Sequence, residues 1–220
     1  MVPRSESPTE QTSTTRRHTT ESRGDRQRQL ILDAAEEALG RIPAQKLSVK
    51  DITEAAGINR PNFYFYFTSK EEVLGQLFTG ALNGWESRAG GFLRRTGEPH
   101  LDYFLRLDDA AFATWVEHAD VMIAGMHTAG VATASENEWN TLVREYNSLV
   151  AGQLSSDLEA GLVAPNSDDH LGMITLLTDM ATYAYYQDRL LKPAPEQTAQ
   201  TRENIKRIWL GAWGVTVGPA

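Results

Sequence analysis

Apolar residues recur every three or four positions along almost the whole chain, and this spacing limits the protein to one fold class. The first such segment begins near Arg26 and ends before Pro43, as expected for a helix that stops ahead of a proline. No window of five residues alternates convincingly between apolar and polar side chains beside a hairpin turn. The sequence therefore predicts an all-α fold with about nine helices and no internal repeat.

Capping residues, glycines and prolines mark where the predicted helices begin and end. Ser48 with Asp51 resembles a capping box, and Gly57 suits the end of the short helix that this box opens. Asn59 and Ser69 suit the caps of the next two helices. After the first helix, the expected helices cover about residues 49–56, 60–65, 70–95, 101–117, 120–130, 136–161, 168–190 and 196–214.

Composition excludes several classes of protein. With 41% hydrophobic and 23% charged residues among 220, the chain can bury a core without covalent links. The absence of cysteine excludes a disulfide framework, a thiolate metal site and a Cys nucleophile. No apolar run approaches the roughly 18 residues of a membrane span, and the N-terminal residues lack the apolar stretch of a signal peptide. We therefore expect a cytoplasmic protein with no membrane partner.

Charge and composition divide the chain unevenly. Residues 1–24 contain ten Ser or Thr, two Pro and no Leu, Ile, Phe, Tyr or Trp, which predicts a disordered tail. The net charge of −8 is the sum of +2 over residues 1–70 and −10 over residues 71–220, so a basic module is joined to an acidic body. Basic residues in and after the tail either attract phosphate or are solvated without a role; they are Arg16, Arg17, His18, Arg23, Arg26 and Arg28.

The segment from Val49 to Phe67 combines a short helix, a turn at Gly57 and a second short helix, which is the pattern of a helix-turn-helix. The second helix of such a unit enters the major groove, where Arg suits guanine and Asn suits adenine. Hydroxyl, ammonium and helix-end amide groups around it suit phosphate oxygens. The residues expected to bind double-stranded DNA are Ser48, Lys50, Asn59, Arg60, Pro61, Asn62, Tyr64, Tyr66, Thr68 and Lys70.

Five consecutive aromatic residues, Phe63 to Phe67, occupy this second helix. Only about half of them can face inward together, because successive residues of a helix point about 100° apart. We expect Phe63 and Phe67 inside and Tyr64 toward DNA, while Phe65 fits either side. The alternative is that the whole run is structural and Tyr64 has no role in DNA binding.

The stretch from Ile52 to Leu74 resembles the DNA-binding signature of the tetracycline-repressor (TetR) family of bacterial regulators. It reads Ile-Thr-Glu-Ala-Ala-Gly-Ile-Asn-Arg-Pro-Asn-Phe-Tyr-Phe-Tyr-Phe-Thr-Ser-Lys-Glu-Glu-Val-Leu. Thr53 stands where alanine is common in the family and Tyr66 where histidine is common, departures that bear on base preference. The residues at the family's spacing are Phe63, Tyr64, Phe67, Lys70, Glu71 and Leu74.

The likeness is strong over residues 28–82 and faint beyond residue 90. Arg60 to Lys70 is also similar to the subgroup that contains the mycobacterial repressor of ethionamide activation. The resemblance implies a DNA-binding domain over residues 25–70 and a ligand-binding and dimerisation domain over residues 71–220. It further implies a homodimer whose two recognition helices lie one DNA turn apart, and a cavity whose filling releases DNA.

Fourteen of the nineteen aromatic residues lie in residues 71–220, where Trp, Tyr and Met suit an adaptable apolar pocket for a small hydrophobic ligand. For each of these residues, ordinary core packing is the alternative. Asp179 and Tyr183, one helical turn apart, are expected to offer polar groups to the ligand unless Asp179 faces solvent. The predicted lining consists of Phe104, Phe112, Trp115, Met122, Met126, Trp139, Tyr146, Asp179, Tyr183 and Trp209.

The last two predicted helices carry more apolar residues than a terminal pair normally covers alone. We expect them to form a four-helix interface in a symmetric dimer, unless one chain folds them against its own core. The residues concerned are Leu171, Ile174, Leu190, Leu191, Ile205, Ile208, Leu210 and Trp213.

The sequence lacks the patterns that enzymes of known chemistry carry. It contains no nucleophile elbow, dinucleotide fingerprint, phosphate loop or His-Glu-x-x-His motif, and its five histidines show no metal-binding spacing. Adjacent acidic pairs such as Asp108-Asp109 diverge by about 100° on a helix and are interpreted as serving solvation or the helix dipole. The Glu117-His118-Asp120 group is interpreted as a solvated helix end. We therefore expect no catalytic residues, metal or cofactor.

The predicted function is a DNA-binding transcriptional regulator, a repressor that a small apolar ligand releases from its operator. The alternatives are a transcriptional activator, a regulator that binds DNA without any ligand, and an all-α interaction module that never binds DNA.

Overall fold

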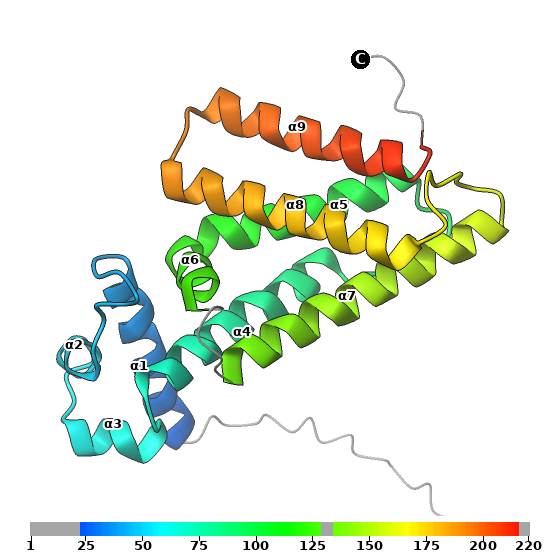
Figure 1. The fold of residues 1–220 in the computed structure, drawn as a ribbon. Helices are drawn as coiled ribbons and strands as arrows, with labels where there is room; N and C mark the ends of the chain where they lie inside the picture. Colours follow the sequence, from blue (N-terminus) through cyan, green and yellow to red (C-terminus); the bar gives the residue numbers. More distant parts are fainter. Residues whose placement is uncertain (1–22, 129–133, 216–220) are drawn as a thin grey trace, which may run out of the picture.

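The computed structural model describes residues 23–128 and 134–215, although not the side chains of residues 127, 128 and 134–139. All regular structure in this part of the chain is helical, which confirms the all-α class (Figure 1). The predicted disordered tail lies outside the described residues, except that Arg23 and Gly24 begin the first helix. The helices are α1 (Arg23–Leu39), α2 (Val49–Ala55), α3 (Arg60–Tyr66), α4 (Lys70–Ala89), α5 (His100–Glu117), α6 (Ala119–Thr128), α7 (Ala134–Glu159), α8 (His170–Leu191) and α9 (Pro195–Ala212).

The predicted caps of the short helices are present. The Ser48 hydroxyl accepts a hydrogen bond from the Asp51 amide, and the Asp51 carboxylate accepts one from the Ser48 amide at 2.9 Å. Asn59 caps α3 in the same manner, accepting from the Asn62 amide at 2.9 Å. Because each bond joins residues three positions apart, the sequence itself fixes where α2 and α3 begin.

The predicted extension of the fourth helix to residue 95 is wrong. α4 ends at Ala89, and Gly90 follows with a φ of 64°, in the left-handed region that closes helices. The apolar spacing continues past this point because Phe92 turns back from the loop onto the core, where its ring centroid lies 4.9 Å from that of Tyr146. Arg106 secures the loop by donating to the Gly91 carbonyl at 2.7 Å.

Two parts of the molecule share one apolar core. α1, α2 and α3 form an N-terminal unit at one end, and α4 to α9 form the body, in which α8 and α9 run antiparallel across α5 (Figure 1). α4 packs against α1 as well as against α5, α6 and α7, and α6 also contacts α1. Two helices therefore connect the body to the N-terminal unit.

Candidate functional site

The turn between α2 and α3 gives the geometry predicted for a helix-turn-helix. Gly57 has a φ of 64°, which glycine adopts without strain. Ile52 of α2 and Phe63 of α3 are both 0% exposed, and Phe67 directly after α3 is 1% exposed. The prediction that Phe63 and Phe67 face inward is confirmed, so α3 is anchored through one face only.

The opposite face of α3 points to solvent. Tyr64 is 53% exposed, and Phe65, whose side was undecided from sequence, is 79% exposed. Arg60, Pro61 and Asn62 are exposed as well. α3 lies at the outer end of the N-terminal unit, away from α8 and α9 (Figure 1), so nothing in the described part of the chain bars a duplex from this face.

Some of the predicted phosphate ligands are already bonded within the protein. Ser48 and Asn59 are occupied as helix caps. Thr68 donates from its amide and its hydroxyl to the Glu72 carboxylate, at 2.7 and 2.8 Å, and these bonds lower the pKa of Glu72. These three residues already make hydrogen bonds that stabilise the N-terminal unit, and a contact with phosphate would be additional to them.

The two predicted lysines differ in their surroundings. The Lys70 ammonium donates to the carbonyl of Leu47 at 2.7 Å and to that of Ala44 at 3.2 Å, which ties the loop before α2 to the start of α4. The Lys50 ammonium lies 3.6 Å from Glu54 on a side chain that is 72% exposed. Lys50 is therefore the more available of the two to a phosphate.

Arg28, which the sequence associates with the basic tail, instead joins three helices. Its guanidinium lies 4.4 Å from the centre of the Phe67 ring, donates to the Tyr66 carbonyl at 2.9 Å and lies 3.5 Å from the Glu72 carboxylate. It also donates to Gln76 at 3.2 Å. Tyr66 is half-buried beside it, so the end of α3 is fixed relative to α1 and α4.

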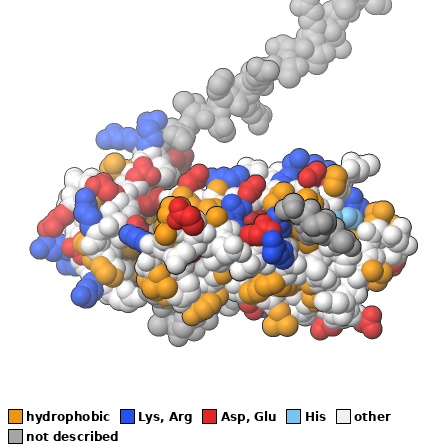
Figure 2. Space-filling view, turned by 90° about the horizontal axis from the view of Figure 1, so that it is seen from above, with side chains coloured by type: hydrophobic (Ala, Val, Ile, Leu, Met, Phe, Trp, Pro, Cys, Tyr) orange, Lys and Arg blue, Asp and Glu red, His pale blue; other side chains and the backbone are white. Residues whose placement is uncertain are grey.

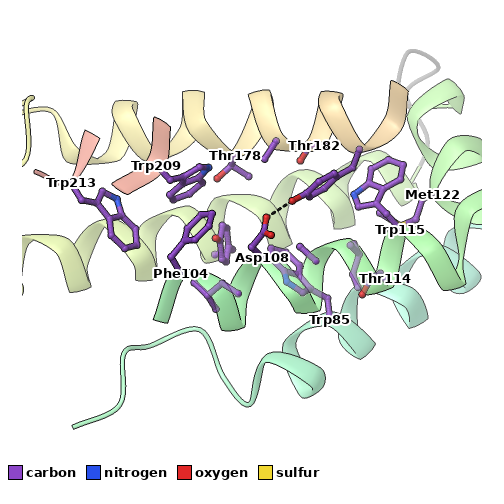
Figure 3. A pocket seen from close by; sticks show the side chains of 16 residues that line it. Trp85, Phe104, Asp108, Thr114, Trp115, Met122, Thr178, Thr182, Trp209 and Trp213 are labelled. Atoms are coloured by element: carbon purple, nitrogen blue, oxygen red, sulfur yellow. Dashed lines mark hydrogen bonds between the residues drawn. The ribbon is translucent and has the colours of Figure 1, made fainter. Parts of the chain in front are cut away.

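A cavity of about 70 Å³ lies inside the body (Figure 3). Five predicted lining residues border it: Phe104, Trp115, Met122, Tyr146 and Trp209. Eleven further residues, which sequence reasoning missed, complete the lining: Leu82, Trp85, Leu107, Asp108, Ala111, Thr114, Thr178, Ala181, Thr182, Tyr185 and Trp213.

The other predicted lining residues lie elsewhere. Phe112 packs beside the cavity against the Tyr185 ring, with ring centroids 5.3 Å apart, and Met126 packs on the core without bordering the cavity. Asp179 is exposed and Tyr183 is 58% exposed, so neither offers a polar group to the cavity. The side chain of Trp139 lies outside the described residues.

On α8, the predicted lining residues lie on the wrong side of the helix. The residues of α8 that border the cavity are Thr178, Ala181, Thr182 and Tyr185, a stripe with steps of three, one and three positions. Asp179 and Tyr183 each follow a member of this stripe directly, and one position turns a side chain by about 100°. The prediction chose Asp179 because it is polar, but the residues of α8 that face inward are the weakly polar Thr178 and Thr182.

The charged group of the cavity is Asp108, which the sequence analysis interpreted as solvated. Its carboxylate is buried, accepts from the Tyr185 hydroxyl (Figure 3) and accepts from Arg202 Nε at 3.1 Å. Burial raises the pKa of Tyr185, so this hydroxyl remains a donor. Asp108 stands four positions after Phe104 on α5, and this spacing is the sequence signal that could have placed it inside.

Two donors at the cavity have no partner in the part of the chain that the structure describes. They are the indole N–H groups of Trp85 and Trp213, both buried. An unpaired buried donor costs free energy that an acceptor on a bound molecule recovers. The wall of the cavity is thus mostly apolar and contains two buried indole donors without a partner.

α6 joins the cavity to the N-terminal unit. Met122 of α6 borders the cavity, while His118, directly before α6, lies with Nδ1 2.8 Å from Glu36 Oε1 on α1. Glu117 pairs with Arg88 of α4. Glu117 and His118 do end α5 and are partly exposed, as predicted, and both also make contacts between helices.

Half of the predicted dimer-interface residues are buried within the single chain: Ile174, Ile205, Leu210 and Trp213 have at most 3% of their surface exposed. The remaining apolar residues of α8 and α9 form an outward surface, which we call the α8–α9 face. Figure 2, a view from the side of α9, shows hydrophobic side chains at the surface among charged ones. The α8–α9 face contains Leu171, Leu176, Tyr183, Leu190, Leu191 and Ile208.

None of the helices in residues 23–128 and 134–215 has the length and hydrophobicity of a membrane-spanning segment. No group of three or more His, Cys, Asp or Glu side chains in those residues has the arrangement of a metal site.

Comparison with known proteins agrees with this geometry. Residues 31–77 match the family model of bacterial regulatory proteins of the tetR family. The regulator EthR of Mycobacterium tuberculosis is 26% identical over 200 residues, which cover 88% of this chain and 90% of EthR. EthR of Mycolicibacterium smegmatis is 27% identical over 192 residues, covering 86% and 87%.

Solved structures share the fold. A TetR-family regulator from Rhodococcus superposes with a TM-score of 0.71 at 16% identity, over 86% of this chain and 99% of that one. A TetR-family protein from Mesorhizobium loti gives 0.67 at 16% identity, over 89% and 100%. Together with the helix-turn-helix of α2 and α3, these matches show that the chain is similar to transcriptional regulators of the tetR family, EthR among them.

Proposed function

We propose that the protein is a homodimeric repressor that binds a palindromic operator through α3 of each protomer and leaves it when a small apolar ligand enters the cavity. The observation that carries this proposal is the position of the cavity. It borders α4 and α6, and these two helices of the body also pack against α1.

The small volume of the cavity supports a mechanism in which a bound ligand expands the cavity and so releases the DNA. Its volume of about 70 Å³ holds a few water molecules, whereas an engineered cavity that takes up benzene measures about 150 Å³. A ligand of ten or more heavy atoms must therefore displace lining side chains such as Leu82 on α4 and Met122 on α6. Movement of α4 and α6 changes the placement of α1 and the helix-turn-helix on the body, so the ligand favours a dimer whose recognition helices no longer match successive grooves.

The lining also suggests the chemistry of the ligand. Its walls are mostly aromatic and aliphatic, and two residues of the wall, Trp85 and Trp213, carry buried indole donors without a partner in the described residues. Asp108 is neutralised by Arg202, so the cavity offers no unpaired charge to an ionic ligand. The ligand class is thus an apolar molecule with hydrogen-bond acceptors.

The α8–α9 face supports the dimer. On α8 the exposed residues Leu176, Tyr183 and Leu190 follow one another at steps of seven, and Leu176 is 73% exposed. Packing this stripe and Ile208 of α9 against a second copy removes apolar surface from water in a four-helix arrangement. A dimer also presents two copies of α3 to a palindromic site.

The DNA part of the proposal is tested by selecting binding sites from random duplex with the full chain. Enrichment of a palindrome whose half-sites lie about 10 base pairs apart is expected. No enrichment, together with no salt-dependent binding to any duplex, would refute DNA binding and leave an interaction module. The position of the operator relative to the promoter then separates a repressor from an activator.

The ligand part is tested with medium-chain aliphatic ketones and the matched alkanes. The ketones are expected to raise the melting temperature and to weaken operator binding, and the alkanes to do both less. Ala111→Phe fills the cavity and should abolish both effects, whereas Ala113→Phe, on the same helix but outside the lining, should keep them. Ketone binding that leaves operator affinity unchanged would contradict release.

The dimer is tested by sedimentation of Leu176→Glu, which places a charge in the α8–α9 face. We expect dissociation into monomers and loss of operator binding. Leu93→Glu is the matched control, since Leu93 is 51% exposed in the loop after α4 and is not a member of that face. A Leu176→Glu protein that remains dimeric would place the interface elsewhere.

A further inference from the structure

The outward face of α3 is apolar at its centre. Successive residues of a helix turn by about 100°, so the direction opposite the buried pair Phe63 and Phe67 is that of Phe65, with Pro61 one turn earlier. Arg60, Asn62 and Tyr64 lie to the two sides of this line. The middle of the surface that meets the major groove therefore has no hydrogen-bonding side chain.

The exposure of Phe65 is the largest of any bulky hydrophobic residue in the described part of the chain, at 79%. A phenyl ring at this position adds nothing to the core, which Phe63 and Phe67 already fill. Nor does the ring belong to the α8–α9 face, which lies far from α3 (Figure 1). Its surroundings on α3 indicate contact with DNA.

The ring is held in place before any duplex arrives. It meets the Tyr66 ring edge to face, with centroids 5.0 Å apart and planes at 79°. Tyr66 is half-buried, and its carbonyl accepts from Arg28 at 2.9 Å. Because the end of α3 is fixed in this way, Phe65 projects from a rigid support, which favours a specific contact over a general one.

Only one group on the floor of the major groove is apolar, the C5-methyl of thymine. The other base edges carry donors and acceptors, and a phenyl ring pressed onto them removes water without replacing its hydrogen bonds. The ring therefore gains by facing a thymine and loses by facing the other bases.

We propose that Phe65, supported by Pro61, is a specificity-determining residue that recognises the C5-methyl of one thymine in each half-site. This inference rests on the proposed function, since it requires α3 to enter the major groove. It adds a base preference that the polar residues Arg60 and Asn62 do not supply.

The test replaces thymines of the selected operator by deoxyuridine, one position at a time, which removes the methyl group and nothing else. Binding of the full-length protein is measured for the unchanged chain and for Phe65→Ala. At one symmetric position, the unchanged protein should lose about three- to fivefold in affinity for each methyl removed, as for one buried methyl group. Phe65→Ala should bind the operator more weakly and show no further loss at that position.

Two controls accompany the scan. Tyr64→Phe keeps an aromatic ring beside Phe65 and should retain the full response to deoxyuridine. Since the Phe65 ring is exposed, Phe65→Ala should melt at the same temperature as the unchanged chain.

The outcomes separate this inference from the proposed function. If the unchanged protein and Phe65→Ala respond equally at every position while both bind the operator, recognition of the methyl group by Phe65 is refuted and DNA binding stands. If the unchanged protein binds no operator at all, the proposed function fails, and the inference fails with it.

Discussion

The N-terminal unit and the body are specified by interactions of different range. In the N-terminal unit, α2 and α3 begin at bonds between residues three positions apart, such as Ser48 with Asp51. In the body, buried charges meet from distant parts of the chain: Arg202 and Asp108 are 94 positions apart, and Arg94 and Asp157 are 63 apart. Local bonds set where α2 and α3 begin, although Arg28 also ties α3 to α1 and α4, and long-range ion pairs hold the body.

This difference teaches where stability and function can be separated. On α3 the side chains proposed for DNA are exposed, so replacing them removes little from the folded state. In the body, the polar groups near the cavity are buried and bonded to one another, so replacing them leaves partners without bonds.

The largest effect is expected for Asp108→Ala. The change leaves the Tyr185 hydroxyl and the Arg202 guanidinium without their buried acceptor. Loss of one partner from such a buried pair lowers the free energy of unfolding by about 3–5 kcal/mol. Urea unfolding followed by circular dichroism measures it.

The matched control is the neighbouring Asp109→Ala. Asp109 also pairs with Arg202, but its side chain is 66% exposed. Exposed pairs contribute about 0–1 kcal/mol. Equal losses for the two variants would show that the buried cluster does not carry the stability of the body.

In the N-terminal unit, replacing exposed residues should weaken DNA binding and leave the stability of the fold unchanged. Arg60→Ala is expected to weaken operator binding by about 1–3 kcal/mol and to relax the preference at particular bases. Lys50→Ala should weaken binding to all duplexes and lower the salt slope by about one. Fluorescence anisotropy at several salt concentrations measures both.

Neither variant should change the melting temperature, because both side chains are exposed. Lys70→Ala is the informative contrast: it removes the bonds to the Ala44 and Leu47 carbonyls, so it should lower stability as well as binding. An unchanged salt slope for Lys50→Ala would mean that Lys50 does not contact phosphate.

The same difference in range explains how much the sequence could predict. The caps at Ser48 and Asn59, the turn at Gly57 and the inward side of Phe63 all depend on residues within about four positions, and all were predicted correctly. The apolar spacing also found the body helices and five of the sixteen residues that border the cavity, including Trp115 and Trp209.

What the sequence could not supply depends on packing between helices. Asp179 and Thr178 are neighbours on α8, and only the position of α5 and α7 beside α8 decides which one borders the cavity. The spacing from Phe104 could have placed Asp108 on the inner side of α5, but the sequence does not identify Arg202, 94 positions away, as its partner. Ile174 and Leu190 look alike on α8, yet the single chain buries the first and exposes the second.

A smaller effect on stability is expected when the pH is lowered, through a carboxyl group in the loop between α4 and α5. Arg106 donates to both oxygens of Glu98, at 2.7 and 2.9 Å, and lowers the pKa of Glu98 to about 2. A carboxyl whose pKa is lower in the folded state stabilises that state above the unfolded pKa, and this contribution disappears as the pH falls from about 4.5 to 2.

Allowing for screening by solvent, the contribution of Glu98 is about 1–2 kcal/mol. Glu98→Gln should therefore be less stable than the unchanged chain at pH 6, and the difference should shrink toward pH 2. Glu159→Gln, at an exposed position on α7, serves as control and should follow the unchanged chain. A constant difference across this range would exclude Glu98 as the titrating group.

Two glycine variants test the junction between the two regions. A Cβ added to Gly125 of α6 would lie 2.5 Å from the buried ring of Phe78 on α4, so Gly125→Ala must push the two helices apart. Overpacking of this kind costs about 1–3 kcal/mol. A Cβ added to Gly152 of α7 would meet nothing within 4 Å, so Gly152→Ala should stabilise the helix by about 0.5–1 kcal/mol.

If α4 and α6 connect the cavity to α1, Gly125→Ala should also weaken operator binding without any ligand, whereas Gly152→Ala should leave it unchanged. Unfolding and anisotropy measurements on the two variants decide this, and a Gly125→Ala protein with full operator affinity would show that the body can shift at α6 without moving the N-terminal unit.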